Sequence, residues 1–340
     1  MGKIVCFGEI MLRLNPEGYL RFRQASRFEA SYAGGEANVA VSLANYNMDA
    51  SFVTKLPDND IAKAAVDELR RYGVYTGDIV YGGDRLGIYY IEKGASQRPS
   101  KVIYDRKYSS IATAKREDFN WDAIFDGAEW FHFTGITPAL GDNVAEICMD
   151  ACKAARAGNI TISCDLNYRK KLWTPEKAGR VMSSLMEYVD VCIANEEDAE
   201  VVFGIKAENT DVDSGKLSHE GYKRVARTLA EKFGFSKVAI TLRTSISAND
   251  NKWAGMLYEN GEFYFSREYL IHIVDRVGGG DSFGGGLIYA SIKGMPPQQV
   301  IEFAVAASCL KHTIEFDLNQ VTVDEVLSLM GGDSSGRVKR

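Results

Sequence analysis

The sequence lacks several features that mark common classes of protein. It has no run of about 18 apolar residues that could span a membrane, and its first residues do not form a signal peptide. It also has no excess of positive charge: 40 Lys and Arg stand against 46 Asp and Glu, which gives a net charge of −6. Nucleic-acid-binding surfaces are usually basic. We therefore expect a cytoplasmic protein that binds neither a membrane nor nucleic acid.

Metal-binding and standard nucleotide-binding signatures are missing as well. The six cysteines lie mostly within apolar patterns, and Cys148 and Cys152 lack a His or second Cys pair that would complete a zinc site. No Gly-Lys pair is followed by Ser or Thr, so there is no P-loop of the Walker type. The glycines after Gly278 do not fit G-x-G-x-x-G, because the position five further on is Phe283. A nicotinamide-dependent oxidoreductase is therefore disfavoured.

The second half of the chain alternates between strand and helix patterns. Short apolar runs at Trp130–Phe133, Ile160–Cys164 and Val189–Ala194 are each followed by a segment with helical periodicity. This rhythm predicts a mostly parallel, doubly wound α/β sheet. With 46% hydrophobic residues in 340, the chain can bury a large core, as one large domain or two modest ones.

Polar residues gather directly after these predicted strands. In open α/β sheets, ligands bind in the crevice beyond the carboxyl ends of the strands, so these residues predict a site on topology alone. They are Thr134, Asn167, Arg169, Asn195, Asp198, Thr241 and Arg243.

A glycine-rich turn leads into the apolar helix predicted at 282–293. Gly278, Gly279 and Gly280 leave backbone N–H groups accessible at a helix N-terminus, where an anion is stabilised. Asp281 follows at once. A carboxylate beside an anion cradle indicates phosphoryl transfer, with Asp281 taking the proton of an attacking hydroxyl. The structural alternative is an Asp that merely caps the helix.

The first 112 residues contain a second glycine turn and two irregular, aromatic-rich stretches. Gly34 and Gly35 open a helix in which Asn38 lies one turn further on. Within 75–112, Val102, Tyr104 and Arg106 share one face of a predicted strand, and Ile88, Tyr90 and Glu92 share one face of another. Such faces can be cross-strand packing or the underside of a cover over a ligand.

These motifs resemble the ribokinase (PfkB) family of sugar kinases. Gly34-Gly35-x-x-Asn38 matches its N-terminal signature, and Asp275-x-x-Gly278-x-Gly280-Asp281 matches its C-terminal one. Asn195-x-x-Asp198 is similar to the family's Asn-x-x-Glu motif, with Asp in place of Glu. The 2-keto-3-deoxygluconate kinase branch is the most similar. Its shared segments are Asp275–Phe283 (with Arg276), Phe131–Ile136, Asp165–Arg169 and Thr241–Arg243.

The resemblance implies a fold and two substrates. The fold is a three-layer α/β/α domain over residues 1–330, with a β lid made from about 12–32 and 84–111 that often also joins two subunits. Residues 331–340 are expected to be a disordered tail. The implied reaction is ATP- and Mg²⁺-dependent phosphorylation of 2-dehydro-3-deoxy-D-gluconate at its 6-hydroxyl. A requirement for a monovalent cation is left open.

The resemblance also implies roles for individual residues. Asp281 matches the catalytic base, and Gly278, Gly279 and Gly280 match the anion hole. Residues matching the substrate site are Gly34, Gly35, Asn38, Tyr90, Tyr104, Arg106, Asn167, Arg169 and Asp275. The expected nucleotide site comprises Asn195, Thr241, Arg243, Gly278, Gly280, Ala307 and Ser308. Asn195 and Asp198 are expected to hold Mg²⁺ indirectly, through water.

The arginines separate a sugar acid from a neutral sugar. A substrate carboxylate calls for a guanidinium fork that holds two oxygens and stays charged. We predict Arg169 as the carboxylate clamp, with Arg106 assisting from the lid; the alternative for either is an ordinary surface ion pair. Two rival functions remain: a neutral-sugar kinase of the fructokinase or ribokinase type, and a non-catalytic sugar sensor.

Overall fold

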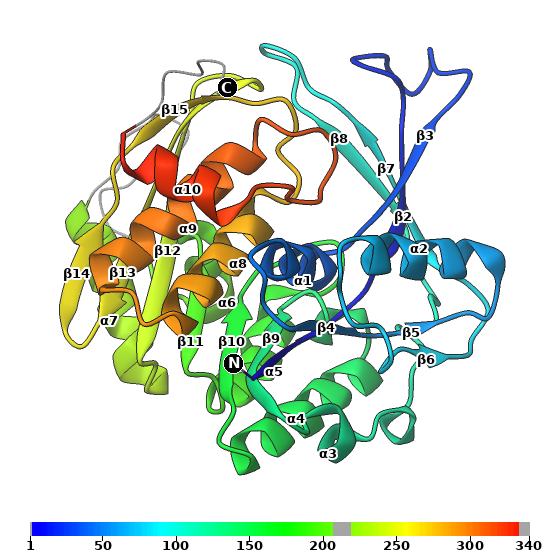
Figure 1. Cartoon of the computed structure of the whole chain (residues 1–340), viewed down its shortest axis with the longest axis horizontal. Helices are drawn as coiled ribbons and strands as arrows, with labels where there is room; N and C mark the ends of the chain where they lie inside the picture. The colour runs from blue at the N-terminus through cyan, green and yellow to red at the C-terminus, as the bar shows by residue number, and fades with distance from the viewer. Residues whose placement is uncertain (1, 207–218, 333–340) are drawn as a thin grey trace.

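A nine-stranded sheet forms the middle layer of the protein. The computed structural model describes residues 2–206 and 219–332, with only the backbone of Glu196. Six neighbouring strands run parallel, and three antiparallel strands extend one edge (Figure 1). The order is β14 (Glu262–Phe265), β13 (Asp250–Glu259), β12 (Lys237–Ser245), β11 (Val191–Ala194), β10 (Thr161–Asp165), β9 (Ala128–Thr134), β1 (Lys3–Phe7) and β4 (Ala50–Val53), with β15 (Tyr269–His272) also paired to β13.

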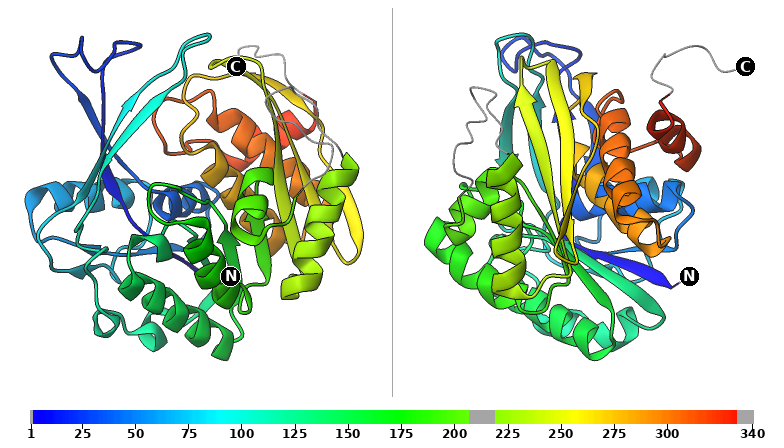
Figure 2. Two further views of the ribbon diagram at one scale, coloured as in Figure 1. Left: turned by 180° about the vertical axis from the view of Figure 1, so that it is seen from behind. Right: turned by 90° about the vertical axis from the view of Figure 1, so that its left-hand side faces the viewer.

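Helices cover both faces of this sheet (Figure 2). Each face has its own buried apolar cluster, which gives the three-layer α/β/α arrangement predicted from the sequence. One cluster includes residues from α1 (Gly35–Asn45), α2 (Asp60–Arg71), α8 (Gly279–Ile292), α9 (Pro297–Lys311) and α10 (Val323–Met330). The other includes residues from α3 (Trp121–Ile124), α4 (Asp142–Ala157), α5 (Pro175–Met186), α6 (Glu196–Phe203) and α7 (His219–Phe233).

The central strands are apolar on both sides because helices lie over both faces. Ile4, Val5, Cys6 and Phe7 in β1 are all fully buried, as is usual in parallel sheets. The six cysteines are buried and unpaired, as expected from the sequence. Among the described residues, no helix is long and apolar enough to cross a membrane.

A second, four-stranded sheet stands beyond the carboxyl ends of the parallel strands (Figure 1). We call it the lid sheet, and its order is β3 (Glu29–Ala33), β2 (Met11–Asn15), β7 (Gly87–Glu92) and β8 (Lys101–Asp105). Its strands fall almost entirely within the ranges 12–32 and 84–111. A two-stranded pair, β5 (Lys55–Leu56) and β6 (Val80–Tyr81), lies apart from it. Of the tail expected at 331–340, residues 333–340 lie outside the described part of the chain.

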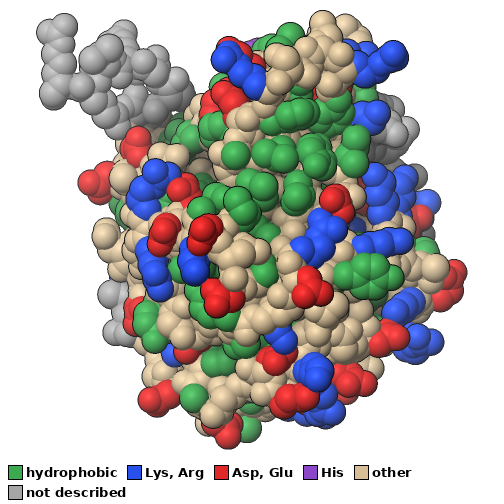
Figure 3. Space-filling model, turned by 90° about the vertical axis from the view of Figure 1, so that its right-hand side faces the viewer, with side chains coloured by type: hydrophobic (Ala, Val, Ile, Leu, Met, Phe, Trp, Pro, Cys, Tyr) green, Lys and Arg blue, Asp and Glu red, His purple; other side chains and the backbone are tan. Residues whose placement is uncertain are grey.

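The two faces of the lid sheet differ in chemistry. Met11, Tyr89 and Ile91 lie on the inner face, where they pack with Val277 beside the end of the main sheet. The alternating residues face outward, and they are largely apolar. Figure 3 shows hydrophobic side chains gathered in the upper half of the face that carries the lid. By the strand register, the outward residues are Leu12, Leu14, Ile88, Tyr90 and Ile103.

Candidate active site

The glycine turn (residues 275–280) is packed closely against Asp317 and His312 on one side and is open on the other. Gly278 has φ of 82°, in the left-handed region, and a Cβ there would lie 2.0 Å from the Asp317 carbonyl oxygen. A Cβ on Gly279 would lie 2.4 Å from the His312 ring, whereas Gly280 has no atom within 4 Å of its Cβ position. Only glycine fits the first two positions. The third leaves the N-terminus of α8 accessible to an anion.

Asp281 lies in the first turn of α8, where Asn38 of α1 orients it. Asn38 Nδ2 donates a 2.7 Å hydrogen bond to Asp281 Oδ2. Burial, reinforced by the nearby Asp317 and Glu36, raises the pKa of Asp281 to about 7; the Asn38 hydrogen bond and Arg169 act in the opposite direction. A carboxylate with a pKa near the working pH is suited to accept a proton.

A cavity of about 390 Å³ opens over the glycine turn, and we call it the arginine cavity. Arg243 and Arg276 line it, and neither forms a salt bridge with a carboxylate in the described part of the chain. Burial and the charge of Arg243 lower the pKa of Arg276. Two neighbouring guanidiniums that form no salt bridge in the described residues favour a polyanionic ligand. This cavity is also lined by Thr241 and Asn195, which were predicted for the nucleotide site, and by Asp198, which was predicted to hold Mg²⁺ through water.

Oxygen-bearing side chains crowd one wall of the arginine cavity. Asn195 caps α6 by accepting a 2.8 Å hydrogen bond from Asp198 N, and Asp198 Oδ1 accepts one of 3.1 Å from Tyr168 N. The sequence reasoning missed Asp165, although it precedes the predicted Asn167. Burial, followed by the charges of Asp198 and Asp281, raises the pKa of Asp165 well above its ordinary value.

These oxygen ligands fit Mg²⁺, because a hard cation would relieve their mutual repulsion. Within residues 2–206 and 219–332, no three His, Cys, Asp or Glu side chains are arranged to hold a metal directly. The indirect contact of Asn195 and Asp198 with Mg²⁺, through water, stays a prediction.

A smaller pocket of about 90 Å³ lies between α1 and the inner face of the lid sheet, and we call it the lid pocket. Asp281 lines both this pocket and the arginine cavity, so it lies at the junction of the two. The lid pocket brings together most of the predicted substrate residues: Gly34, Gly35, Asn38, Tyr104, Arg106, Asn167 and Arg169. A groove of about 790 Å³ along β8 is also lined by Tyr104, Arg106 and Arg169.

The two predicted substrate arginines differ in their partners. Arg106 Nε donates a 2.8 Å hydrogen bond to Glu9 Oε2, and its Nη2 forms an ion pair with the same oxygen. Ser109 donates to the other oxygen of Glu9 at 2.6 Å. Arg169 donates one hydrogen bond to the Tyr168 carbonyl oxygen and, among the described residues, forms no salt bridge. Of these two arginines, Arg169 is therefore the one that no salt bridge neutralises in the described residues, although Asp281 also lines the lid pocket.

Five predicted site residues line neither cavity: Tyr90, Ala307, Ser308, Gly279 and Asp275. Tyr90 lies on the outer face of the lid sheet, where its ring packs against Phe28 at 6.1 Å between centroids. Tyr89 occupies the inner face instead and lines the lid pocket, because side chains alternate along a strand. Ala307 and Ser308 are fully buried in the face of α9 that packs on α8. The Ser308 hydroxyl donates to the Gly279 carbonyl oxygen at 2.7 Å, so it supports the turn from below.

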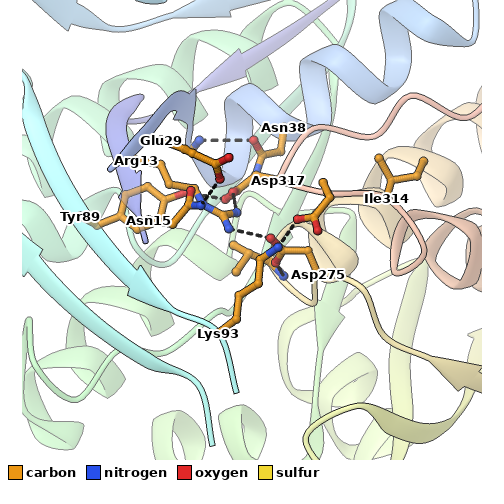
Figure 4. Close-up of polar contacts among 12 residues, drawn as sticks. Arg13, Asn15, Glu29, Asn38, Tyr89, Lys93, Asp275, Ile314 and Asp317 are labelled. Carbon is orange, nitrogen blue, oxygen red and sulfur yellow. Dashed lines mark hydrogen bonds and ion pairs between the residues drawn. The ribbon is translucent and has the colours of Figure 1, made fainter. Parts of the chain in front are cut away.

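Asp275 is buried, and its carboxylate forms a salt bridge with Arg13, a residue that the sequence did not indicate as part of the site. Arg13 of β2 reaches between Asp275 and Asp317 (Figure 4). Arg13 Nη2 lies 2.6 Å from Asp275 Oδ2, Arg13 Nη1 pairs with Asp317, and Tyr89 donates to Asp317 at 2.6 Å. Asp317 lines the lid pocket, whereas Asp275 lines neither cavity. A contact between Asp275 and a substrate stays a prediction.

Glu36 is a second residue that sequence reasoning did not assign. It is buried and accepts hydrogen bonds from Thr134 N at 3.0 Å and Thr134 Oγ1 at 2.8 Å. The Thr137 hydroxyl donates to the same oxygen at 2.5 Å. These bonds fix the N-terminus of α1, and with it Asn38, against the end of β9. The available signal was a Glu immediately after the first glycine turn.

A doubly wound sheet, an anion-binding helix N-terminus and a carboxylate at the junction of two cavities define a phosphotransferase of the ribokinase-like α/β class. The chain matches the description "pfkB family carbohydrate kinase" over residues 1–313, and it belongs to this family of carbohydrate kinases.

Its relatives cover nearly the whole chain. A 2-dehydro-3-deoxygalactonokinase from Haloferax volcanii is 33% identical over 334 residues, 98% of each chain. The crystal structure of a 2-dehydro-3-deoxygluconokinase from Thermotoga maritima is 54% identical, with a TM-score of 0.94 over 97% of this chain and 98% of that one. The structure of a PfkB family carbohydrate kinase from Listeria grayi is 34% identical, with a TM-score of 0.90 over 97% and 99%.

Proposed function

We propose that this kinase transfers the γ-phosphoryl group of ATP to the 6-hydroxyl of 2-dehydro-3-deoxy-D-gluconate. One observation carries the proposal: Asp281 and Arg169 both line the arginine cavity and the lid pocket, and Arg243 and Arg276 line the arginine cavity without salt bridges in the described residues. A polyanion bound in the arginine cavity and a carboxylate-bearing acceptor bound in the lid pocket would meet at Asp281, the proposed base. The Thermotoga and Haloferax relatives are named as a 2-dehydro-3-deoxygluconokinase and a 2-dehydro-3-deoxygalactonokinase, and these names support this substrate class.

Asp281 accepts the proton of the attacking hydroxyl in this mechanism. Asn38 occupies Asp281 Oδ2, which leaves Oδ1 to receive the proton. The amides of Gly278–Asp281 hold phosphoryl oxygens at the N-terminus of α8, where transferred charge is stabilised without reorganisation. Arg243 and Arg276 hold the remaining nucleotide phosphates. Bound Mg²⁺ would neutralise phosphate charge, with Asn195, Asp198 and Asp165 as its holding residues through water.

Arg169 binds the carboxylate of the acceptor. Its guanidinium lines the lid pocket and forms no salt bridge in the described residues, whereas Glu9 already neutralises Arg106. Arg106 therefore contributes a hydrogen bond to the acceptor but no net positive charge, and its contact with Glu9 holds the end of β8 in place. Tyr89 and Tyr104 flank the acceptor from the inner face of the lid sheet. The lid would keep competing water from the phosphoryl group.

A coupled assay of ADP release tests this assignment. We expect turnover with 2-dehydro-3-deoxy-D-gluconate, ATP and Mg²⁺, and little with gluconate, fructose or ribose. The galactose-derived epimer belongs in the panel, because the Haloferax relative is named for it. Turnover with fructose or ribose but not the acid would retain the role of Asp281 and reject that of Arg169. Tight sugar binding without ADP release would identify a sensor.

We also propose that two subunits associate through the outer face of the lid sheet. Phe28 and Ile103 are exposed there by 41% and 43% of their surfaces, next to the outward Tyr90, and a contiguous apolar face favours association. Ile103→Lys should convert a dimer to a monomer in light scattering. Leu270→Lys, at an apolar residue exposed by 74% on β15 away from the lid sheet, serves as the control. A monomeric wild-type protein would contradict the proposal.

A further inference from the structure

Lys311, the last residue of α9, is completely buried. Lysine is almost never fully buried unless its charge is compensated. Its ammonium nitrogen lies 3.3 Å from the Asp275 carbonyl oxygen and 3.3 Å from the Ile314 carbonyl oxygen. One of these carbonyls belongs to the first residue of the glycine turn. Lys311 therefore ties the beginning of that turn to the segment after α9.

The same segment supports the rest of the turn. The His312 carbonyl oxygen accepts hydrogen bonds from Val274 N at 2.8 Å and Asp275 N at 3.3 Å. The Asp317 carbonyl oxygen lies directly below Gly278. The backbone that presents the amides of α8 thus rests on residues 308–317, and Lys311 supplies the positive charge in this support.

Asp275 and Asp317 share one salt-bridged cation, Arg13, in the described residues, so this pair of carboxylates needs a second positive charge to be balanced. Arg276 also acts on Asp275, and Asp281 acts on Lys311, so one further charge of each sign lies nearby. Burial lowers the pKa of Lys311, while Asp275 and Asp317 act in the opposite direction. With Lys311 charged, two cations meet two carboxylates. Without it, a buried negative charge would lie beside main-chain carbonyl oxygens, a set of ligands that attracts a cation.

We infer that Lys311 is a positioning residue for phosphoryl transfer, a tethered cation that holds the glycine turn in the shape that aims its amides at the transferred group. Lys311 lines neither the arginine cavity nor the lid pocket, so it acts through the turn and not by touching a substrate. The inference rests on the proposed function only for the measurement of kcat. The measurement of thermal unfolding requires no substrate.

The test compares two substitutions that remove the charge but differ in space. Lys311→Ala leaves a void bordered by carbonyl and carboxylate oxygens, whereas Lys311→Met fills the volume with an apolar chain. We expect kcat to fall on the order of 10²-fold in both, as for a small misplacement of reacting groups, with KM for the sugar acid nearly unchanged. Ammonium or potassium chloride should restore part of kcat in Lys311→Ala but not in Lys311→Met.

Thermal unfolding provides the readout that does not depend on the reaction. Potassium or ammonium chloride should raise the Tm of Lys311→Ala more than tetramethylammonium chloride at equal ionic strength. Wild type and Lys311→Met should respond equally to all three salts. Lys55→Ala, which removes an ion pair with Asp118 elsewhere in the fold, is the control and should show no cation preference.

The outcomes separate the inference from the proposed function. A cation-specific rise in Tm for Lys311→Ala supports the tethered cation even if the sugar acid proves to be the wrong substrate. Wild-type kcat in folded Lys311→Met would overturn the inference. So would a Tm of Lys311→Ala that responds equally to all salts, or failure of both variants to fold in every salt, because Lys311 would then serve stability alone.

Discussion

Replacing Asp281 by Asn should abolish turnover and stabilise the protein at alkaline pH. The substitution keeps the size of the side chain and removes the proton acceptor. Because general-base catalysis contributes roughly 10²–10⁴-fold, we expect kcat to fall by at least that range. In wild type, kcat should rise with pH through about 7, the pKa of Asp281.

The effect on stability follows from the raised pKa. Between the ordinary value of 3.8 and about 7, folded protein retains a proton that the unfolded chain has released. The free energy of unfolding therefore falls as pH rises through this window and levels off above it. At about 1.4 kcal/mol per pKa unit, ionised Asp281 costs at most about 4 kcal/mol. Water reaching it from the cavities reduces this, so we expect about 1–3 kcal/mol.

Activity and thermal unfolding can be measured on the same preparations. The advantage in Tm of Asp281→Asn over wild type should grow between pH 5.5 and pH 8. Asp67→Asn is a matched control, since the Asp67 side chain is 75% exposed on α2, and it should change neither kcat nor the pH dependence of Tm. Wild-type kcat in Asp281→Asn would refute the assignment of the base. A Tm difference independent of pH would refute the electrostatic reasoning.

Four other substitutions probe the two cavities, with Tyr90→Phe as the control for Tyr89→Phe. Arg169→Met should raise KM for the sugar acid roughly 10- to 100-fold, the worth of a charged hydrogen bond, and leave KM for ATP unchanged; equal effects on both would count against a carboxylate clamp. Arg276→Met should raise KM for ATP and leave KM for the sugar acid unchanged. Initial-rate kinetics with each substrate varied in turn would contradict a phosphate-binding role for Arg276 if KM for ATP stayed unaltered. Tyr89→Phe should raise KM for the sugar acid, whereas Tyr90→Phe should not, and the opposite ranking would return Tyr90 to the site.

Local sequence signals predicted the parts of the site that depend on one element at a time. The apolar runs and the polar residues after them predicted the parallel sheet and its binding edge, because both follow from strand periodicity. The glycines at 278–280 predicted the helix N-terminus. Strand alternation correctly placed Val102 and Tyr104 on the inner face of the lid sheet, and Arg106, just after β8, lines the lid pocket with Tyr104. The three antiparallel strands at the sheet edge were not predicted, because they lack a helix between them and break the rhythm.

Contacts between distant segments could not be read from local patterns. Arg13 and Asp275 are 262 positions apart, and nothing near Arg13 distinguishes its buried face from an exposed one. To choose between Tyr89 and Tyr90, one must know which face of β7 is turned toward the main sheet. Only the packing of the folded protein decides this. Ala307 and Ser308 were expected in the nucleotide site from the family resemblance. In the structure the small residues of α9 instead permit its close contact with α8.

The most direct measurement is the identity of the phosphorylated product. Incubation with ATP, Mg²⁺ and 2-dehydro-3-deoxy-D-gluconate should give one new phosphomonoester signal in ³¹P NMR. Coupling to the two protons of C6 should split that signal into a triplet. A phosphomonoester formed from fructose or ribose, with none formed from the acid, would contradict the account, as would an ester at a secondary hydroxyl.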